Sequence, residues 1–171
     1  MAEASVRLRS WRAQDAPALA AAWNDPTIAA ASQPPDDRSL DAAARWIEGC
    51  AVREERLLAI DRVVSVDGAC VGEVGLSSMD PARKAAVVGW WIGIGHRGNG
   101  FATAAVRELI GVAFDEFDIR TLVAEIGIEN AGSVRVAERT GFELLRQGSE
   151  DRPHAYVHRH HCITSTRFSS S

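Results

Sequence analysis

Hydrophobic and polar positions along the first 50 residues predict a short strand followed by two helices. Val6 and Leu8 alternate with arginines, which is the spacing of a strand with one buried face. A first helix is expected from Asp15, with a proline in its first turn, up to a turn at residues 24–26. A second is expected from Ser39, because small and apolar residues recur there every three or four positions. Between them, residues 32–37 contain two adjacent prolines and are expected to form a loop.

Three apolar runs in the middle of the chain predict three strands. The first two, residues 57–65 and 69–77, are separated by a short segment containing an Asp-Gly pair, which is typical of a hairpin turn. The third, residues 86–94, is apolar at both odd and even positions. A strand of this kind is expected inside a sheet rather than at its edge.

The second half of the chain predicts two helices alternating with strands. From Gly98 the apolar positions take helical spacing as far as Phe117. A strand follows at residues 120–128, then a short helix capped by Asn130 and ended by Gly141, and finally two closing strands. This order of elements predicts a mixed α/β sheet.

Length and composition agree with an ordinary globular protein. A chain of 171 residues, 46% hydrophobic and 25% charged, can bury one sizeable core, so we expect one domain over residues 1–163. Residues 164–171 are polar and rich in Ser and Thr, as in a flexible tail. No stretch approaches the roughly 20 apolar residues of a membrane span, and a cytoplasmic protein is expected. The net charge of −4 and the lack of a basic patch argue against nucleic acid as a partner.

The cysteines and histidines of the chain do not predict a metal site. The chain has three cysteines, Cys50, Cys70 and Cys162. Their odd number and wide spacing predict reduced thiols rather than disulfides or a zinc site. Four histidines lie close together near the C-terminus, at positions His154, His158, His160 and His161. No cysteine or carboxylate completes a convincing ligand set there, so no metal is expected.

The segment most informative about function is Arg97-Gly98-Asn99-Gly100-Phe101-Ala102, between a buried strand and an amphipathic helix. Its glycines let backbone N–H groups converge on an anion at the positive end of the helix, where pyrophosphate is the usual anion. Residues 93–98 also spell the dinucleotide fingerprint G-x-G-x-x-G. That fold requires an acidic residue at the end of the next strand, but the acidic residues at that distance lie in the helix and its exit. A third interpretation is a tight turn without a ligand.

One family accounts for more of these residues at once. Arg97-x-x-Gly100-x-Ala102 resembles the R/Q-x-x-G-x-G/A loop of the GNAT superfamily of N-acetyltransferases, which binds the pyrophosphate of acetyl-CoA. Residues 88–93 resemble the splayed strand before that loop, and residues 129–133 and 140–142 resemble its E-N-x-x-S and x-G-F segments. The combination is most similar to the RimJ/RimL branch, which acetylates N-terminal amines of ribosomal proteins.

The resemblance implies a fold and a set of residues that bind acetyl-CoA. The fold would be α/β (α+β), with a mixed, mostly antiparallel central sheet, helices on both faces and a splayed strand pair holding acyl-CoA. Backbone atoms of Trp91, Ile92 and Gly93 would pair with the pantetheine arm. Asn130 would bond the pantetheine, and Ser133 would lie near the thioester sulfur. The loop around the pyrophosphate would comprise Arg97, Gly98, Asn99, Gly100, Phe101, Ala102 and Thr103.

The implied reaction is direct attack of a primary amine on acetyl-CoA in a ternary complex. It requires a polarised carbonyl, a proton for the leaving thiolate and a base for the ammonium. A strand N–H near Ile92 and the hydroxyl of Ser133 suit the first two tasks. For the base, many relatives carry a carboxylate on the strand before the loop, but residues 86–91 contain none. The resemblance implies Glu150 as the first candidate, because RimL-like enzymes carry a glutamate in the segment after Phe142, and Glu73 on the preceding strand is the second.

Two other functions stay open at this point. The missing strand carboxylate is compatible with a non-catalytic sensor module that binds acyl-CoA, and the glycine fingerprint with a dinucleotide-binding oxidoreductase. The sequence does not choose among acceptors, which include a protein N-terminus and small-molecule amines. An apolar helix face or strand edge could also form a homodimer.

Overall fold

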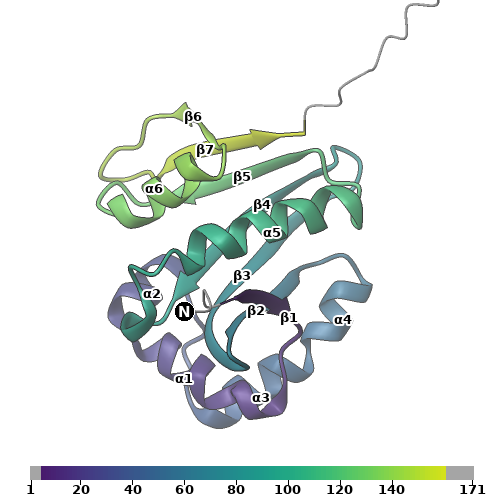
Figure 1. Ribbon diagram of the computed structural model, residues 1–171, viewed down its shortest axis with the longest axis vertical. Coiled ribbons are helices and arrows are strands. Elements are labelled where there is room, and N and C mark those ends of the chain that lie inside the picture. Colours follow the sequence, from purple (N-terminus) through teal and green to yellow (C-terminus); the bar gives the residue numbers. More distant parts are fainter. Residues whose placement is uncertain (1–4, 161–171) are drawn as a thin grey trace, which may run out of the picture.

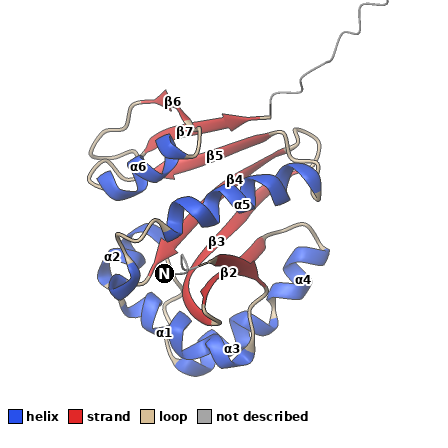
Figure 2. Cartoon of the chain, in the orientation of Figure 1, coloured by secondary structure: helices blue, strands red, loops and turns tan. Residues whose placement is uncertain are grey.

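The computed structural model describes residues 5–160, which form a mixed sheet with helices on both faces (Figures 1 and 2). The strands are β1 (Val6–Arg9), β2 (Ile60–Val66), β3 (Ala69–Asp80), β4 (Ala85–Ile92), β5 (Thr121–Ile126), β6 (Glu143–Arg146) and β7 (His154–Arg159). The helices are α1 (Ala16–Asn24), α2 (Pro26–Ser32), α3 (Leu40–Glu48), α4 (Cys50–Glu55), α5 (Phe101–Asp115) and α6 (Ala131–Arg139). Two short 3-10 turns are η1 (Ala13–Asp15) and η2 (Ile94–His96).

The sheet has the strand order β1-β2-β3-β4-β5-β7-β6. Every neighbouring pair is antiparallel except β4 and β5. These two are parallel and pair only through residues 85–87 of β4, although β4 continues to Ile92. The strands therefore separate beyond Val87. This confirms the mixed, mostly antiparallel sheet with a splayed pair, and it is not the parallel sheet of a dinucleotide-binding fold.

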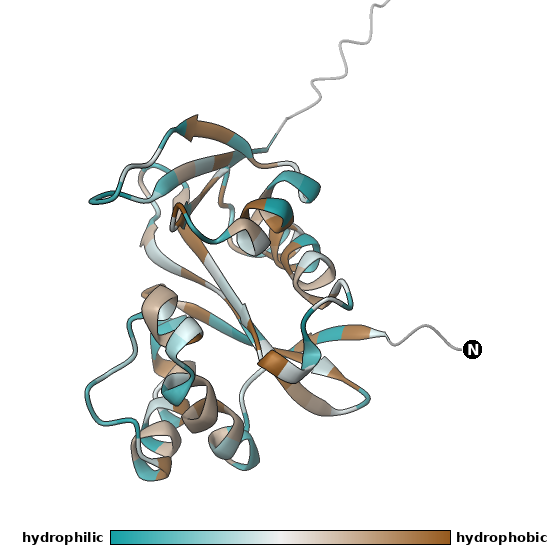
Figure 3. Cartoon of the chain, turned by 90° about the vertical axis from the view of Figure 1, so that its left-hand side faces the viewer, coloured by the Kyte–Doolittle hydropathy of each residue, from teal (hydrophilic) through white to brown (hydrophobic). Residues whose placement is uncertain are grey.

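Two apolar cores lie on opposite faces of the sheet, and in Figure 3 apolar strands run between two groups of helices. On one face, Val106 and Leu109 of α5 belong to the core formed with Val74 and Val88. On the other face, helices α1 and α3 cover Val63 with apolar and aromatic side chains. Because successive strand residues point to opposite faces, β2, β3 and β4 contribute to both cores. Each fully buried Val or Leu contributes about 1.5–3 kcal/mol to stability.

Helix α2 was not predicted, and the turn at residues 24–26 proves to be the start of a helix. The carboxylate of Asp25 accepts hydrogen bonds from the backbone N–H groups of Thr27 (2.8 Å) and Ile28 (3.2 Å). Pro26 occupies the first helical position, where a missing N–H costs nothing. Ile28 is buried and anchors the helix. The turn residues therefore end α1 and cap α2.

Other local predictions are confirmed, with one boundary corrected. Asp67 and Gly68 adopt φ of 50° and 84°, as expected for the hairpin between β2 and β3. The hydroxyl of Ser39 accepts a 3.1 Å hydrogen bond from the N–H of Ala42 and caps α3. The helix expected from Ser39 is interrupted at Gly49, and α4 begins after it.

Some predictions lie beyond the described residues. The tail over residues 164–171 and Cys162 fall outside them. Within residues 5–160, none of the helices is long and apolar enough to cross a membrane.

Candidate functional site

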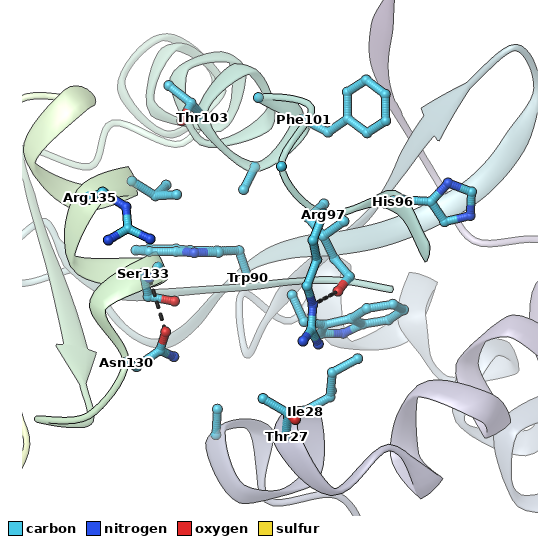
Figure 4. Close-up of a pocket in the computed structure, with 18 of the residues that line it drawn as sticks. Thr27, Ile28, Trp90, His96, Arg97, Phe101, Thr103, Asn130, Ser133 and Arg135 are labelled. Atoms are coloured by element: carbon cyan, nitrogen blue, oxygen red, sulfur yellow. Dashed lines mark hydrogen bonds between the residues drawn. The ribbon is translucent and has the colours of Figure 1, made fainter. Parts of the chain in front are cut away.

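A cavity of about 410 Å³ opens where β4 and β5 separate, and we call it the splay cavity (Figure 4). Its walls come from α2, the end of β4, the loop before α5, the first turn of α5, and α6. A volume of this size suits a small-molecule ligand. The position follows from the topology, because the backbone edge of β4 beyond Val87 has no partner strand on this side.

The loop before α5 has a backbone that glycine alone adopts readily. Gly98 and Gly100 have φ of +81° and +78°, in the left-handed region. Gly100 is the N-cap of α5, and no side chain from the described residues caps this helix. The first N–H groups of α5 are therefore left for a ligand. Because α5 is 15 residues long, its dipole adds positive potential at the same place.

Asn130 and Ser133 meet at the start of α6, on the other side of the splay cavity (Figure 4). The side-chain oxygen of Asn130 accepts a 3.0 Å hydrogen bond from the N–H of Ser133. The amide nitrogen of Asn130 keeps its two donors. The hydroxyl of Ser133 forms no hydrogen bond with any residue between 5 and 160, so it can bond to a ligand.

Three arginines give the splay cavity a positive lining. Arg135 and Arg139 project from α6, and neither forms an ion pair within the described part of the chain. Arg97 donates from Nε to the carbonyl of Ile92 at 2.9 Å and lies 3.8 Å from the carboxylate of Asp25. In Figure 4, Trp90 lies between Arg97 and Arg135. Together with the N-terminus of α5, these cations suit an elongated ligand that carries phosphates.

Most residues proposed from sequence for the binding of acetyl-CoA gather in this cavity. Those that line it are Trp91, Ile92, Arg97, Gly98, Gly100, Phe101, Ala102, Thr103, Asn130 and Ser133. Asn99 does not line it, but its side-chain amide donates to the carbonyls of His96 and Arg97 and fixes the loop. Gly93 lines a neighbouring cavity of about 250 Å³ beneath α1, the α1 cavity, and its N–H donates to Val71 of β3 at 2.9 Å.

The predicted base Glu150 is exposed in the turn between β6 and β7, where Ser149 and Arg152 form an isolated bridge. It lines neither the splay cavity nor the α1 cavity. Sequence reasoning also did not include the lining residues of α2, Thr27, Ile28 and Ala31, nor the two arginines of α6. Of these residues, only Arg135 and Arg139 could have been recognised from the sequence, because residues four apart share a helix face.

Trp90 and Trp91 lie on opposite faces of β4, as their adjacency predicts. Trp90 packs against the core under α5, and Trp91 against the core under α1 and α3. Both line the splay cavity, and Trp91 also lines the α1 cavity. Trp91 is thus the side chain shared by the two spaces.

Glu73 of β3 lies directly opposite Trp91 in β4. It is partly buried and forms no hydrogen bond or ion pair within residues 5–160. Burial, together with the nearby Asp61, raises the pKa of Glu73 to about 8, although Arg53 acts in the opposite direction. Burial also raises the pKa of Asp61, although Arg53 donates to its carboxylate at 3.1 Å.

The histidines near the C-terminus pack against an aromatic ring. His158 and His160 lie 5.5 and 4.9 Å from Phe114, ring centre to ring centre. Within the described residues, no group of three or more His, Cys, Asp and Glu side chains is placed to hold a metal ion. His161 lies outside them.

The chain is similar to known acetyltransferases in sequence and in fold. A family described as acetyltransferase (GNAT) domain matches residues 5–143. YdaF of Bacillus subtilis (strain 168), provisionally named a ribosomal N-acetyltransferase, is 36% identical over 76 residues, which cover 44% of this chain and 42% of YdaF. The ribosomal-protein-serine acetyltransferase of Escherichia coli (strain K12) is 24% identical over 107 residues, covering 63% of this chain and 60% of the relative.

Both alignments span less than two thirds of the relative's own length. Among solved structures, Mycobacterium smegmatis RimJ in complex with CoA-disulfide superposes with a TM-score of 0.77 at 20% sequence identity. The superposition covers 90% of this chain and 81% of that one. At this identity the likeness is one of fold.

Proposed function

Since the chain belongs to the acetyltransferase (GNAT) family, we propose that it transfers an acetyl group from acetyl-CoA to a primary amine. The observation that carries the proposal is the uncapped N-terminus of α5 behind Gly98 and Gly100, which opens into the splay cavity. Pyrophosphate suits that helix end, and the separated edges of β4 and β5 suit an extended arm.

The donor would lie along residues that already face the cavity. The first turn of α5 binds the pyrophosphate, and the pantetheine arm runs along the free edge of β4 beside Trp91 and Ile92. Asn130 donates from its side-chain nitrogen to the arm. In this arrangement the thioester sulfur would lie near Ser133.

The chain's own groups supply two of the three chemical tasks. A backbone N–H of β4 near Ile92 polarises the thioester carbonyl, and the hydroxyl of Ser133 protonates the leaving thiolate. Binding donor and acceptor together makes the attack effectively intramolecular. No covalent enzyme intermediate is required.

Two carboxylates are candidates for the base. Glu150 would act directly or through water from the exposed turn between β6 and β7. Glu73 lies on β3, opposite Trp91, which lines the splay cavity. Like Glu150, Glu73 lines neither cavity, but its cross-strand neighbour Trp91 lines both, which favours Glu73.

The acceptor class is part of the proposal. The names of the E. coli relative and of other similar structures refer to ribosomal-protein acetylation, so a protein N-terminal amine is the first acceptor to test and small-molecule amines are the second. We place the protein in the cytoplasm on the same grounds. A homodimer stays a prediction; the edge strand β6 exposes Leu144 and Leu145.

A second candidate is a sensor that binds acetyl-CoA without turnover, because β4 carries no carboxylate. Calorimetric titration with acetyl-CoA, CoA and NAD in parallel tests the donor. Assay of free thiol with an unblocked peptide and with spermidine then tests turnover. Binding of acetyl-CoA with turnover supports the enzyme, binding without turnover supports the sensor, and binding of NAD alone would overturn both.

A further inference from the structure

Arg97 and Asp25 connect the splay cavity to the α1 cavity. Arg97 lines the splay cavity, and Asp25 lines the α1 cavity. A terminal nitrogen of Arg97 lies 3.8 Å from Oδ2 of Asp25. In Figure 4 the side chain of Arg97 extends from the loop before α5 toward α2. Ile28, Trp91 and His96 line both cavities, so the two spaces adjoin around this pair.

The two oxygens of the Asp25 carboxylate have different partners. Oδ1 accepts the hydrogen bonds from the backbone N–H groups of Thr27 and Ile28 that cap α2, whereas Oδ2 faces Arg97. An asparagine at this position would therefore keep the cap and lose only the charge. The hydrogen bonds from Ile28 and Thr27 lower the pKa of Asp25, and Arg97 lowers it as well. The carboxylate is thus charged at neutral pH.

Arg97 also covers the free edge of β4. Its Nε donates to the carbonyl of Ile92 at 2.9 Å (Figure 4). The N–H of Gly93, in the same peptide unit, donates to Val71 of β3. Since the C=O and N–H of a trans peptide point in opposite directions, the carbonyl of Ile92 points away from β3, to the side on which β4 and β5 separate. A ligand that pairs with this edge competes with Arg97 for that carbonyl.

The α1 cavity suits a cationic ligand when Arg97 does not occupy Asp25. Among the described residues that line this cavity, Asp25 carries the only carboxylate. Trp91 adds an aromatic wall, and aromatic faces attract cations. The thiol of Cys70 stays neutral because burial raises its pKa to about 11. While Arg97 lies beside Asp25, the charge of the carboxylate is balanced and a second cation is repelled.

A donor that carries pyrophosphate would replace both contacts of Arg97. The pyrophosphate proposed for the first turn of α5 would lie beside the loop that begins with Arg97. It carries more negative charge than one carboxylate, and hydrogen bonds between arginine and phosphate are charge-assisted and frequently bidentate. The extended arm of the same ligand would take the carbonyl of Ile92. One ligand would therefore draw Arg97 away from Asp25.

We propose that Arg97 is a switch between the two cavities. It balances the charge of Asp25 while the splay cavity is empty, and it leaves Asp25 when acetyl-CoA binds, so that donor binding opens the α1 cavity to a cationic acceptor. This role of Arg97 rests on the proposed acetyl transfer, which supplies the anionic donor. Asp25 is then a positioning residue for Arg97 in the empty protein and a contact for the amine after the donor has bound.

The test measures how a bound donor changes the affinity for a cation. Spermidine and an unblocked tetrapeptide are titrated by calorimetry into the protein with and without saturating CoA, which carries no acetyl group to transfer. The same peptide with an acetylated N-terminus is the ligand control, because it lacks the terminal charge. The variants that test the switch are Asp25→Asn and Arg97→Met.

Asp37→Asn is the matched control variant. Oδ1 of Asp37 also accepts from a backbone N–H, that of Ser39 at 3.0 Å, and its Oδ2 accepts from Arg45 at 3.2 Å. Asp37 lines neither cavity. This variant therefore makes the same chemical change away from Arg97.

In the wild type, CoA should tighten the binding of both amines about fivefold or more, and each amine should tighten CoA binding by the same factor, because coupling is reciprocal. Asp25→Asn should remove the coupling and leave the amines weakly bound with or without CoA. Arg97→Met should also remove it, but with the amines tightly bound even without CoA, because Asp25 is uncovered. Asp37→Asn should show the coupling of the wild type, and the acetylated peptide should show none.

Three results would overturn the switch. Equal coupling in the wild type, Asp25→Asn and Arg97→Met would mean that direct attraction between CoA and the amine accounts for it. Amines that bind the wild type equally well with and without CoA, or that bind in neither case, would also exclude it. The proposed function survives these results if thiol release shows acetyl transfer. Wild-type protein that binds neither acetyl-CoA nor CoA would instead overturn the proposed function and the switch with it.

Discussion

The backbone N–H of Ser133 donates a 3.0 Å hydrogen bond to the side-chain oxygen of Asn130. The bond caps α6 and turns both side chains toward the splay cavity (Figure 4). Because the cap uses the backbone of Ser133, the hydroxyl of this residue is not needed to form the helix. A substitution at Ser133 can therefore change the chemistry without affecting the helix cap, whereas a substitution at Asn130 affects both.

Replacement of Ser133 by Ala should lower kcat with little change in stability. The cap from Asn130 survives, and only the proposed proton donor is lost. We expect a fall of about ten- to a hundredfold in kcat, with acetyl-CoA affinity nearly unchanged. Steady-state kinetics and calorimetry measure the two effects. Ser133→Thr, which keeps a hydroxyl, should restore part of the rate, and a wild-type kcat in Ser133→Ala would remove this residue from the mechanism.

Replacement of Gly100 by Val should weaken acetyl-CoA binding. A β-branched side chain is strained at φ of +78°, so the loop must shift and its N–H groups no longer converge. We expect at least a tenfold rise in the dissociation constant, measured by calorimetry. Gly111→Ala in α5 is the matched control, because its Cβ would meet nothing within 4 Å. The control should gain about 0.5–1 kcal/mol in stability and bind as the wild type does. Equal affinity in a folded Gly100→Val would contradict the role of the loop.

Replacement of Asp15 by Ala should destabilise the protein by about 3–5 kcal/mol, because it leaves the guanidinium of Arg9 half-buried and unpaired. Asp15 is 5% exposed and accepts from both terminal nitrogens of Arg9, at 2.6 and 2.8 Å. Denaturant unfolding measures the loss. Asp37→Ala, which breaks an exposed pair with Arg45, should cost far less. Similar losses in the two variants would argue against a special role for burial.

Asp15 should also make the free energy of unfolding depend on pH in the acid range. Burial by itself would raise the pKa of Asp15, but hydrogen bonds from Arg9 and Arg12 outweigh it and lower the pKa. A lowered folded pKa means that the stabilisation is complete above the unfolded value of about 3.9 and is lost as the pH falls through the folded value. A plot of the free energy of unfolding against pH should therefore be flatter in the acid range for Asp15→Ala than for the wild type.

Glu73 should give the free energy of unfolding the opposite dependence on pH from Asp15. Burial raises its pKa to about 8, so between the unfolded value of about 4.3 and the folded one the native state binds more protons than the unfolded state. Stability then falls as the pH rises through this window. Relative to the wild type, Glu73→Gln should change little in Tm below about pH 4.3 and gain progressively above it, most at alkaline pH. A difference in Tm that does not vary with pH would show that the carboxylate is not perturbed.

The elements with local signals could be predicted from the amino-acid sequence alone. Gly98 and Gly100 fix a backbone that other residues adopt only with strain, and Asp67-Gly68 fixes a hairpin, so these features could be read within a few positions. Asn130 likewise marks a helix start through its own side chain. The loop, the start of α6 and most of the acetyl-CoA set followed from such signals and from the family resemblance they carry.

Which residues from distant parts of the chain lie together depends on the three-dimensional packing. The register between β3 and β4 places Glu73 opposite Trp91, and that between β2 and β3 places Asp61 beside Gly75. Helix α2 was missed because Asp25 and Pro26 suit a turn and a helix start equally well, and the burial of Ile28 selects the helix. Backbone preferences act over a few residues, whereas register and burial depend on how strands far apart in the chain pair. No local pattern contains that information.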